Sequence, residues 1–131
     1  MNVFIVGAGP GDPELITVKG QKLLSEADVI IYAGSLVNPA LLDYAKAGCE
    51  IHNSASMTLP QVINVIEDSV KQGKMVVRLH TGDPSIYGAI QEQMDALDKL
   101  GIEYKVVPGV SSFLATAAAL KQEYTLPGIS Q

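Results

Sequence analysis

The chain has 131 residues, of which 47% are hydrophobic and 18% are charged. A chain of this length forms one compact domain, because folding buries about two thirds of the surface that the unfolded chain exposes. The formal net charge is -5, and the Lys and Arg residues are scattered singly. A nucleic-acid partner is therefore not expected, because a phosphate backbone needs a basic patch or stripe.

Other classes of protein are excluded by single features. Cys49 is the only cysteine, which excludes an intramolecular disulfide and a cysteine zinc cluster. His52 and His80 are far apart in sequence, and no metal site is expected. The amino terminus lacks the basic region and cleavage site of a signal peptide, and no apolar run reaches the roughly 20 residues that span a bilayer. We expect a cytoplasmic protein with no membrane partner.

Short β-branched segments alternate with helical patterns along the whole chain. This alternation predicts βαβ units, an α/β fold and a mainly parallel sheet. The five expected strands are residues 2–6, 29–32, 50–52, 75–79 and 104–107. The five expected helices are residues 17–27, a segment that begins at Asn38, and residues 59–72, 85–100 and 111–120.

Helix ends and helix faces carry further signals. Asn38 suits an N-cap and Pro39 the first helical position, while Gly73 and Gly101 end the third and fourth helices. The fifth helix, residues 111–120, has almost no polar face. Because a helix that is apolar all round is normally buried, we expect a surface outside this chain to cover part of it.

Three glycine-proline loops follow expected strands and precede expected helices. They are residues 7–13, 81–88 and 108–112. In an open α/β sheet, ligands bind in the crevice at the carboxyl ends of the strands. Glycine lets the backbone approach a ligand closely, and proline fixes the turn. Three such loops in one short chain predict one shared binding site.

Each loop alone has a purely structural explanation. The first loop fails the dinucleotide fingerprint, because Asp12 stands where the third glycine belongs and no acidic residue follows Tyr32. On the structural explanation, the first loop is only a tight turn between a strand and a helix. Asp83 suits an N-cap of the fourth helix with Pro84 at its first position, and Ser111 suits the N-cap of the fifth. The occurrence of all three loops together favours a ligand site.

Four segments resemble the amino-terminal domain of the tetrapyrrole methylases, which use S-adenosylmethionine. They are VGAGPGDPELITVKG at residues 6–20, ADVIIY at 27–32, RLHTGDPSIYG at 78–88 and VPGVSS at 107–112. Their order and spacing cover essentially the whole chain. The resemblance implies a three-layer α/β/α fold with a five-stranded sheet. It also implies a methyltransferase that converts S-adenosylmethionine to S-adenosylhomocysteine.

One branch of the family methylates C11 of precorrin-4 or cobalt-precorrin-4 in cobalamin biosynthesis, a part of porphyrin metabolism. This chain is similar to that branch at residues 32–37, 53–59 and 126–131. The uroporphyrinogen-III branch carries an Asp near Ala33 and a Lys near Ser54 or Ala55, and this chain has neither. The general base, and with it the set of catalytic residues, remains unidentified.

The resemblance assigns residues and partners. Cofactor contacts fall on Pro10, Thr81, Gly82, Asp83, Ile86, Ser111 and Ser112. Independently of the resemblance, exposed backbone amides attract anions, so we expect those of the first loop, from Gly9 through Gly11 to Asp12, to receive a carboxylate of the corrinoid substrate if the Asp12 side chain faces away or binds a backbone amide. Residues 1–131 correspond to the first domain, and a second α/β domain and a homodimer are expected in the full-length protein. The single domain is expected to be weak or inactive in catalysis.

Three alternative functions stay open. One is a methyltransferase of the same family that acts on a different precorrin, an RNA or a protein, although the acidic balance counts against RNA. Another is a module that binds adenosine ligands without chemistry. The third is a dimerisation scaffold that binds no ligand.

Overall fold

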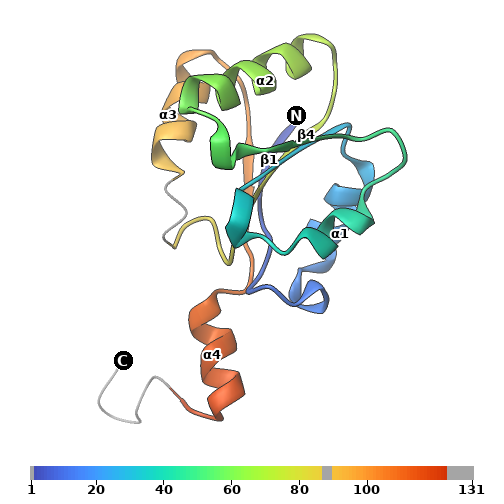
Figure 1. The fold of residues 1–131 in the computed structure, drawn as a ribbon. Helices are drawn as coiled ribbons and strands as arrows, with labels where there is room; N and C mark the ends of the chain where they lie inside the picture. Colours follow the sequence, from blue (N-terminus) through green and yellow to red (C-terminus); the bar gives the residue numbers. More distant parts are fainter. Residues whose placement is uncertain (1, 87–89, 124–131) are drawn as a thin grey trace.

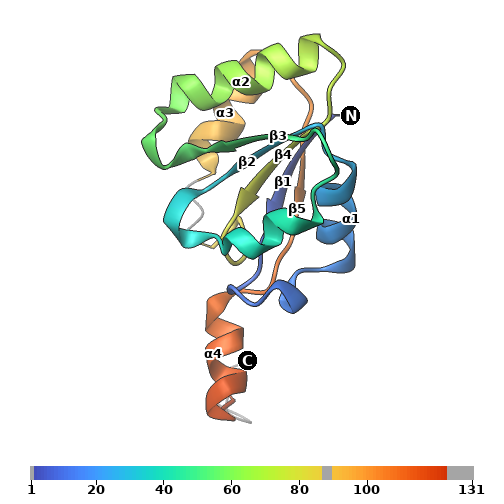
Figure 2. The ribbon, with the colours of Figure 1, turned by 45° about the vertical axis from the view of Figure 1, so that its right-hand side comes forward.

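The computed structural model describes residues 2–86 and 90–123. Its centre is a five-stranded sheet with the order β3-β2-β4-β1-β5, in which every neighbouring pair is parallel (Figure 2). The strands are β1 (Val3–Gly7), β2 (Val29–Tyr32), β3 (Glu50–Asn53), β4 (Val76–His80) and β5 (Lys105–Val107). The predicted α/β class and parallel sheet are confirmed, and all five strands lie within one residue of their predicted ends.

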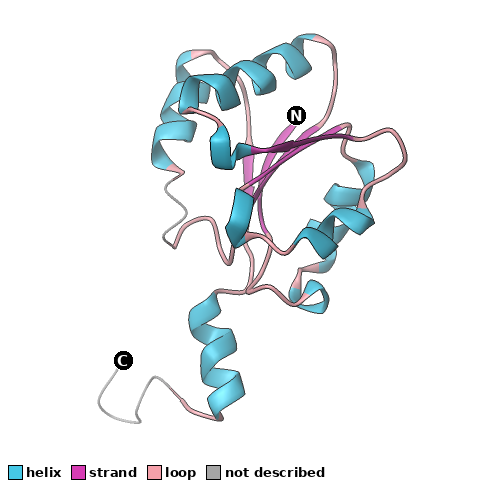
Figure 3. Ribbon diagram, viewed as in Figure 1, coloured by secondary structure: helices cyan, strands magenta, loops and turns pink. Residues whose placement is uncertain are grey.

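Helices cover both faces of the sheet, which gives three layers (Figures 1 and 3). The α-helices are α1 (Val18–Glu26), α2 (Leu59–Lys71), α3 (Gln91–Lys99) and α4 (Ser112–Leu120). The described residues also form four short 3-10 helices, one before α1 and three between α1 and α2: η1 (Pro13–Leu15), η2 (Gly34–Leu36), η3 (Pro39–Tyr44) and η4 (Ser54–Ser56). Helices α1 and η3 pack on one face of the sheet, and α2 and α3 pack on the other.

Strand β4 has buried apolar side chains on both faces of the sheet. Val77 and Leu79 point into the core under α1, whereas Val76 points into the core under α2 and α3. All three side chains are fully buried. A parallel strand covered on both faces needs apolar residues at consecutive positions, and this is the pattern from which the strands were predicted.

Side-chain caps fix where two of the helices begin. The Thr17 hydroxyl accepts a hydrogen bond from the Gly20 amide at 2.9 Å and starts α1. Thr58 and Gln61 form a capping box at the start of α2, each side chain bonding the backbone amide of the other. These caps satisfy amides that have no partner inside the helix.

Two helices differ from their predictions. The segment after Asn38 is a 3-10 helix rather than an α-helix, although Asn38 is its N-cap as predicted. Helix α3 begins at Gln91, not at Ser85, and its N-cap position holds Ile90 without a side-chain cap. The prediction that Asp83 caps this helix is therefore wrong. Part of the predicted helix, residues 87–89, lies outside the described residues.

Helix α4 points away from the body of the domain (Figure 1). Ser111 is its N-cap, as predicted. Phe113, Leu114 and Leu120 are 53%, 62% and 59% exposed, and only Ala117 of the helix is buried. The apolar helix is thus left largely uncovered by the described part of this chain.

Candidate functional site

The three predicted loops meet at the carboxyl ends of the adjacent strands β4, β1 and β5. The amide of Ala8 donates to the carbonyl of His80 at 2.6 Å. Gly9 and Gly82 then exchange two backbone hydrogen bonds, with N–O distances of 3.2 and 2.8 Å. The loop after β1 is thereby joined to the loop after β4, so the predicted convergence of the loops is confirmed.

The crossing of the loops leaves no space for a side chain at two positions, Gly7 and Gly109. A Cβ atom on Gly7 would lie 2.6 Å from the Cα of Gly109 and from the carbonyl oxygen of Gly82. A Cβ atom on Gly109 would lie 2.8 Å from the Cα of Gly7 and still nearer to the Gly82 oxygen. Because these neighbours are backbone atoms, no side chain can rotate to make room.

Asp83 joins the second loop to the third. Its Oδ1 accepts from the amide of Ser85 at 2.8 Å, and its Oδ2 accepts from the amide of Gly109 at 3.1 Å. Both carboxylate oxygens therefore hold backbone. This arrangement is the physical reason that residues 83–86 form a turn instead of the first turn of α3.

A cavity of about 140 Å³ lies between the second loop and the start of α4. Its lining residues are Thr81, Gly82, Asp83, Ile86, Ser111, Ser112 and Phe113. Six of these were predicted as cofactor contacts from the sequence. The seventh predicted contact, Pro10, lies in the first loop and does not line this cavity. Phe113 was not predicted, because an apolar residue in an apolar helix gives no separate signal.

The polar groups of the cavity differ in their availability. The amide, carbonyl and hydroxyl of Thr81 make no hydrogen bond to the described residues, so they are free to bind a ligand. Both backbone groups of Gly82 are taken by Gly9, and the Ser111 hydroxyl accepts from the Phe113 amide at 3.2 Å. Ile86 and Phe113 add exposed apolar surface. A site with these groups suits a ligand that is part apolar and part hydrogen-bonding.

A buried polar network lies under the second loop. Arg78 donates from Nε to Oε1 of Gln93 at 3.0 Å and from NH1 to the carbonyl of Ile31 at 3.2 Å. Since Arg78 can only donate, Oε1 of Gln93 must face it, and Nε2 of Gln93 then donates to Nε2 of His80 at 3.2 Å. The Nε2 atom of His80 therefore carries no proton in this network.

Burial determines the charge states in this network. Arg78 and His80 are each 6% exposed. Burial lowers the pKa of Arg78 to about 10, so the guanidinium keeps its charge at neutral pH. Burial and, second, the nearby Arg78 cation lower the pKa of His80 to about 4, so the imidazole is neutral. The network thus holds one buried cation on β4, three positions before Thr81 in the sequence.

The first loop has its own set of contacts. The carbonyl of Gly11 accepts from Nδ2 of Asn38 at 2.8 Å, and the Asp12 carboxylate accepts from the amide of Glu14 at 2.9 Å. The amides of Gly11 and Asp12 have no hydrogen-bond partner among the described residues. Gly9 uses both of its backbone groups on Gly82. Of the three predicted substrate-binding residues, Gly11 and Asp12 thus keep free donors.

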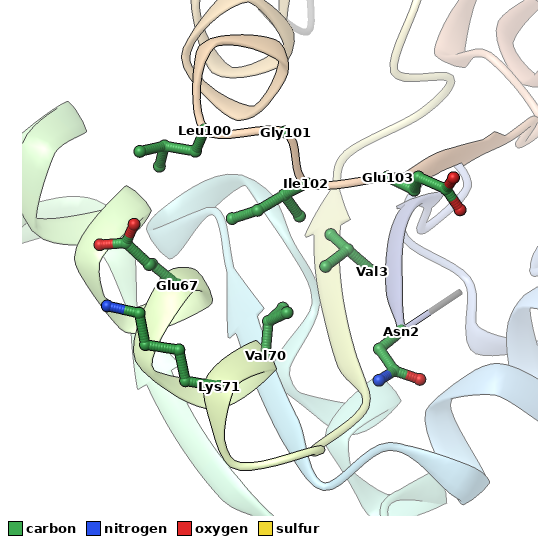
Figure 4. Close-up of a pocket in the computed structure, with 9 residues that line it drawn as sticks. All are labelled: Asn2, Val3, Glu67, Val70, Lys71, Leu100, Gly101, Ile102 and Glu103. Atoms are coloured by element: carbon green, nitrogen blue, oxygen red, sulfur yellow. The ribbon is translucent and has the colours of Figure 1, made fainter.

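A larger hollow, of about 380 Å³, lies at the amino-terminal end of the sheet (Figure 4). Its walls come from the end of α2, the start of β1 and the connection between α3 and β5. The residues that line it are Asn2, Val3, Glu67, Val70, Lys71, Leu100, Gly101, Ile102 and Glu103. None of the predicted site residues lines this hollow.

Metal binding and membrane insertion find no support in the described residues. They contain no group of three or more metal-ligating side chains. His52 instead lies 2.7 Å from Glu50, and this contact lowers the pKa of the Glu50 carboxyl. No helix in the described part has both the length and the apolar character needed to cross a bilayer.

The chain belongs to the tetrapyrrole (corrin/porphyrin) methylase family, whose pattern it matches over residues 2–131. It is 65% identical over 129 residues to a cobalt-precorrin-4 C(11)-methyltransferase of Methanocaldococcus jannaschii, covering 98% of this chain and 50% of the relative. It is 51% identical over 131 residues to a precorrin-4 C(11)-methyltransferase of Pseudomonas aeruginosa, covering 100% of this chain and 52% of the relative.

Solved structures give the same family and fold. A cobalt precorrin-4 methyltransferase superimposes with a TM-score of 0.93 at 52% identity, covering 95% of this chain and 52% of that one. A uroporphyrin-III C-methyltransferase of Thermus thermophilus, complexed with S-adenosylhomocysteine, superimposes with a TM-score of 0.79 at 35% identity, covering 98% and 52%. The chain therefore spans about half the length of the relatives that it matches. The predicted family and three-layer fold are confirmed.

Proposed function

We propose that this chain supplies the cofactor-binding half of a methyltransferase that uses S-adenosylmethionine to methylate C11 of cobalt-precorrin-4 or precorrin-4 in cobalamin biosynthesis. One observation carries the proposal most directly. Six of the seven residues expected to contact the cofactor line a single cavity at the carboxyl ends of the strands. The two precorrin-4 methyltransferases described above, at 65% and 51% identity, support the choice of substrate.

The cavity suits part of S-adenosylmethionine. The free amide, carbonyl and hydroxyl of Thr81 would bind its polar groups, while Ile86 and Phe113 would contact its apolar surface. Small-molecule sites usually enclose about 300–1,000 Å³. A cavity of about 140 Å³ therefore holds only part of S-adenosylmethionine. A second α/β domain, which we infer for the full-length protein, would complete the site and cover the exposed residues of α4.

S-adenosylmethionine supplies an already activated methyl group, because its positively charged sulfur is a good leaving group. The residues of this chain would contribute alignment: they hold the cofactor rigidly at one edge of the sheet and exclude water from one side. Correct positioning of two reactants can contribute about 7–11 kcal/mol in favourable cases. A site of backbone groups and small side chains is therefore sufficient for this half of the enzyme, and no residue is assigned as the general base.

The first loop would contact the corrinoid. Its free amides on Gly11 and Asp12 are suited to a substrate carboxylate, because consecutive unpaired backbone amides attract anions. The Asp12 carboxylate would repel such a group, but it is engaged by the amide of Glu14. We also infer from the family resemblance that the full-length protein is a homodimer. The acidic composition supports a cytoplasmic location and provides no basic stripe for a nucleic-acid partner.

Ligand preference tests the proposal. Titration calorimetry of the chain with S-adenosylhomocysteine, ATP and NAD should give binding to S-adenosylhomocysteine alone. Preference for ATP or NAD would favour a nucleotide-binding module. A lack of binding to all three, both by this chain and by a protein of the relatives' length, would favour a scaffold. A protein of the relatives' length that carries this chain should add one methyl group to precorrin-4, at C11 by NMR. Methylation of a different precorrin would replace the substrate assignment.

A further inference from the structure

The side chain of Asn38 connects two parts of the chain that are far apart in sequence. Its Oδ1 accepts from the amide of Ala40 at 2.9 Å, which is the N-cap contact of η3. Its Nδ2 donates to the carbonyl of Gly11 at 2.8 Å, across 27 positions of sequence. Each end of the amide therefore has a separate partner, and only one of them belongs to the helix that Asn38 caps.

The first loop is held on two sides. Toward β4 it is fixed by the paired backbone groups of Gly9 and Gly82. Toward η3 it is fixed by Asn38 at the carbonyl of Gly11 and by the Tyr44 hydroxyl, which donates to the carbonyl of Pro13 at 3.4 Å. The free amides of Gly11 and Asp12 lie between these fixed points. Gly11 has φ of +125°, in a region that glycine adopts readily. Because glycine has little backbone preference of its own, contacts from other residues must set the direction of the loop here.

We propose that Asn38 is a positioning residue: its bond to the Gly11 carbonyl sets the direction in which the amides of Gly11 and Asp12 point. This proposal rests on the proposed function in one respect, namely that these amides receive a carboxylate of the corrinoid. Donors fixed in advance bind an anion more tightly than donors that must be ordered on binding. The sequence pattern showed Asn38 only as a helix cap.

The choice of residue separates the two roles of Asn38. Asn, Asp and Ser cap helices about equally well, so capping alone accepts any of them. Only Asn also carries, beside the capping oxygen, a second atom that can donate to the Gly11 carbonyl. Asn38→Asp keeps an oxygen for the Ala40 amide but places a second oxygen against the carbonyl of Gly11. Asn38→Ser keeps a capping oxygen and removes the Nδ2 donor, because its single hydroxyl is one bond shorter than the amide of Asn.

The first measurement uses backbone amide NMR of the chain. Asn38→Asp and Asn38→Ser should shift the Gly11 and Asp12 resonances and leave the affinity for S-adenosylhomocysteine within twofold. Asn53→Asp is the matched control, because Asn53 also caps a 3-10 helix through the amide of Ala55 at 2.9 Å but has no bond to the first loop. It should leave the Gly11 and Asp12 resonances in place. Unmoved resonances in both Asn38 variants would overturn the proposal.

The second measurement uses a protein of the relatives' length. Asn38→Asp should raise KM for the corrinoid about tenfold with little change in kcat, and Asn38→Ser should raise it less. A tenfold change corresponds to about 1.4 kcal/mol. An unchanged KM in Asn38→Asp would overturn the link between the loop and the substrate. If the unaltered protein methylates no precorrin, the proposed function fails, and the amide resonances still decide whether Asn38 positions the loop.

Discussion

The amide of Gly109 donates to the carboxylate of Asp83 at 3.1 Å, so the turn after β5 is held by a side chain from the turn after β4. The same carboxylate accepts from the amide of Ser85. Both turns contribute walls to the small cavity at the strand ends. The shape of that cavity therefore depends on a residue whose own oxygens are directed at backbone.

Replacing Asp83 should reduce both stability and ligand binding. Asp83→Ala removes the acceptor of the Ser85 amide, which is exposed, and of the Gly109 amide, which is partly buried. A hydrogen bond of this kind contributes about 0.5–1.5 kcal/mol net. Urea unfolding should show this loss, and calorimetry should show weaker binding of S-adenosylhomocysteine. Asp83→Asn retains one acceptor oxygen and should lose less. Asp43→Ala, at an exposed position on η3, should stay within about 0.5 kcal/mol of the original chain.

An added methyl group at Gly109 should be more damaging than one at Gly48. The Cβ atom of Gly109→Ala would overlap the backbone of Gly7 and Gly82, and overpacking of this kind costs about 1–3 kcal/mol. Gly48 has φ of +82° and no atom within 4 Å of an added Cβ, so Gly48→Ala costs only the left-handed conformation, about 1–2 kcal/mol. The decisive difference is in ligand affinity, which only Gly109→Ala should lower. Equal affinities would contradict the steric crossing.

His80 should make stability depend on pH. Its pKa is about 4 in the folded chain against 6.5 for an ordinary histidine, so between these values the unfolded chain binds more protons. Stability then falls as the pH falls through this window, by up to about 1.4 kcal/mol per pH unit. Between pH 7 and pH 5 the original chain should lose about 2 kcal/mol more than His80→Gln in urea unfolding. Equal losses would show that His80 is not buried in its neutral form.

Helix α4 should promote self-association of the chain. Leu114 and Leu120 are 62% and 59% exposed, and exposed apolar patches favour association. Leu114→Lys combined with Leu120→Lys should lower the apparent mass in sedimentation velocity with little change in Tm. Gln21→Lys combined with Asn64→Lys adds the same charge at exposed polar positions of α1 and α2. If this control lowers the mass equally, net charge rather than the apolar surface is responsible.

The strands could be predicted because their signal is local. The central strands β1, β2 and β4 are short runs rich in buried Val and Ile, whereas the edge strand β3 is largely exposed and has Ile51 as its one β-branched residue. The start of α3 could not be predicted in this way. Ile86 and Ile90 have helical spacing, but the bonds from Asp83 to Ser85 and Gly109 hold the preceding segment in a turn. A contact across 26 positions of sequence outweighs the local periodicity.

The site was only partly predictable for the same reason. The loops that form the cavity have recognisable glycine and proline spacing, and six of its lining residues lie within them. The bonds among Arg78, Gln93 and His80 depend on where α3 packs against β4, and no spacing in the sequence indicates them. The bond from Asn38 to Gly11 could not be predicted, because the role of helix cap alone already explains an asparagine at that position.

The crossing of Gly7, Gly82 and Gly109 has a consequence for engineering chimeras. Each backbone occupies the space that a side chain on its neighbour would need, so the turns are not modular. A single turn taken from a distant homologue would have a backbone conformation that fits the neighbouring turns of that homologue and not those of this chain. Specificity swaps at this edge should therefore exchange all three segments at once.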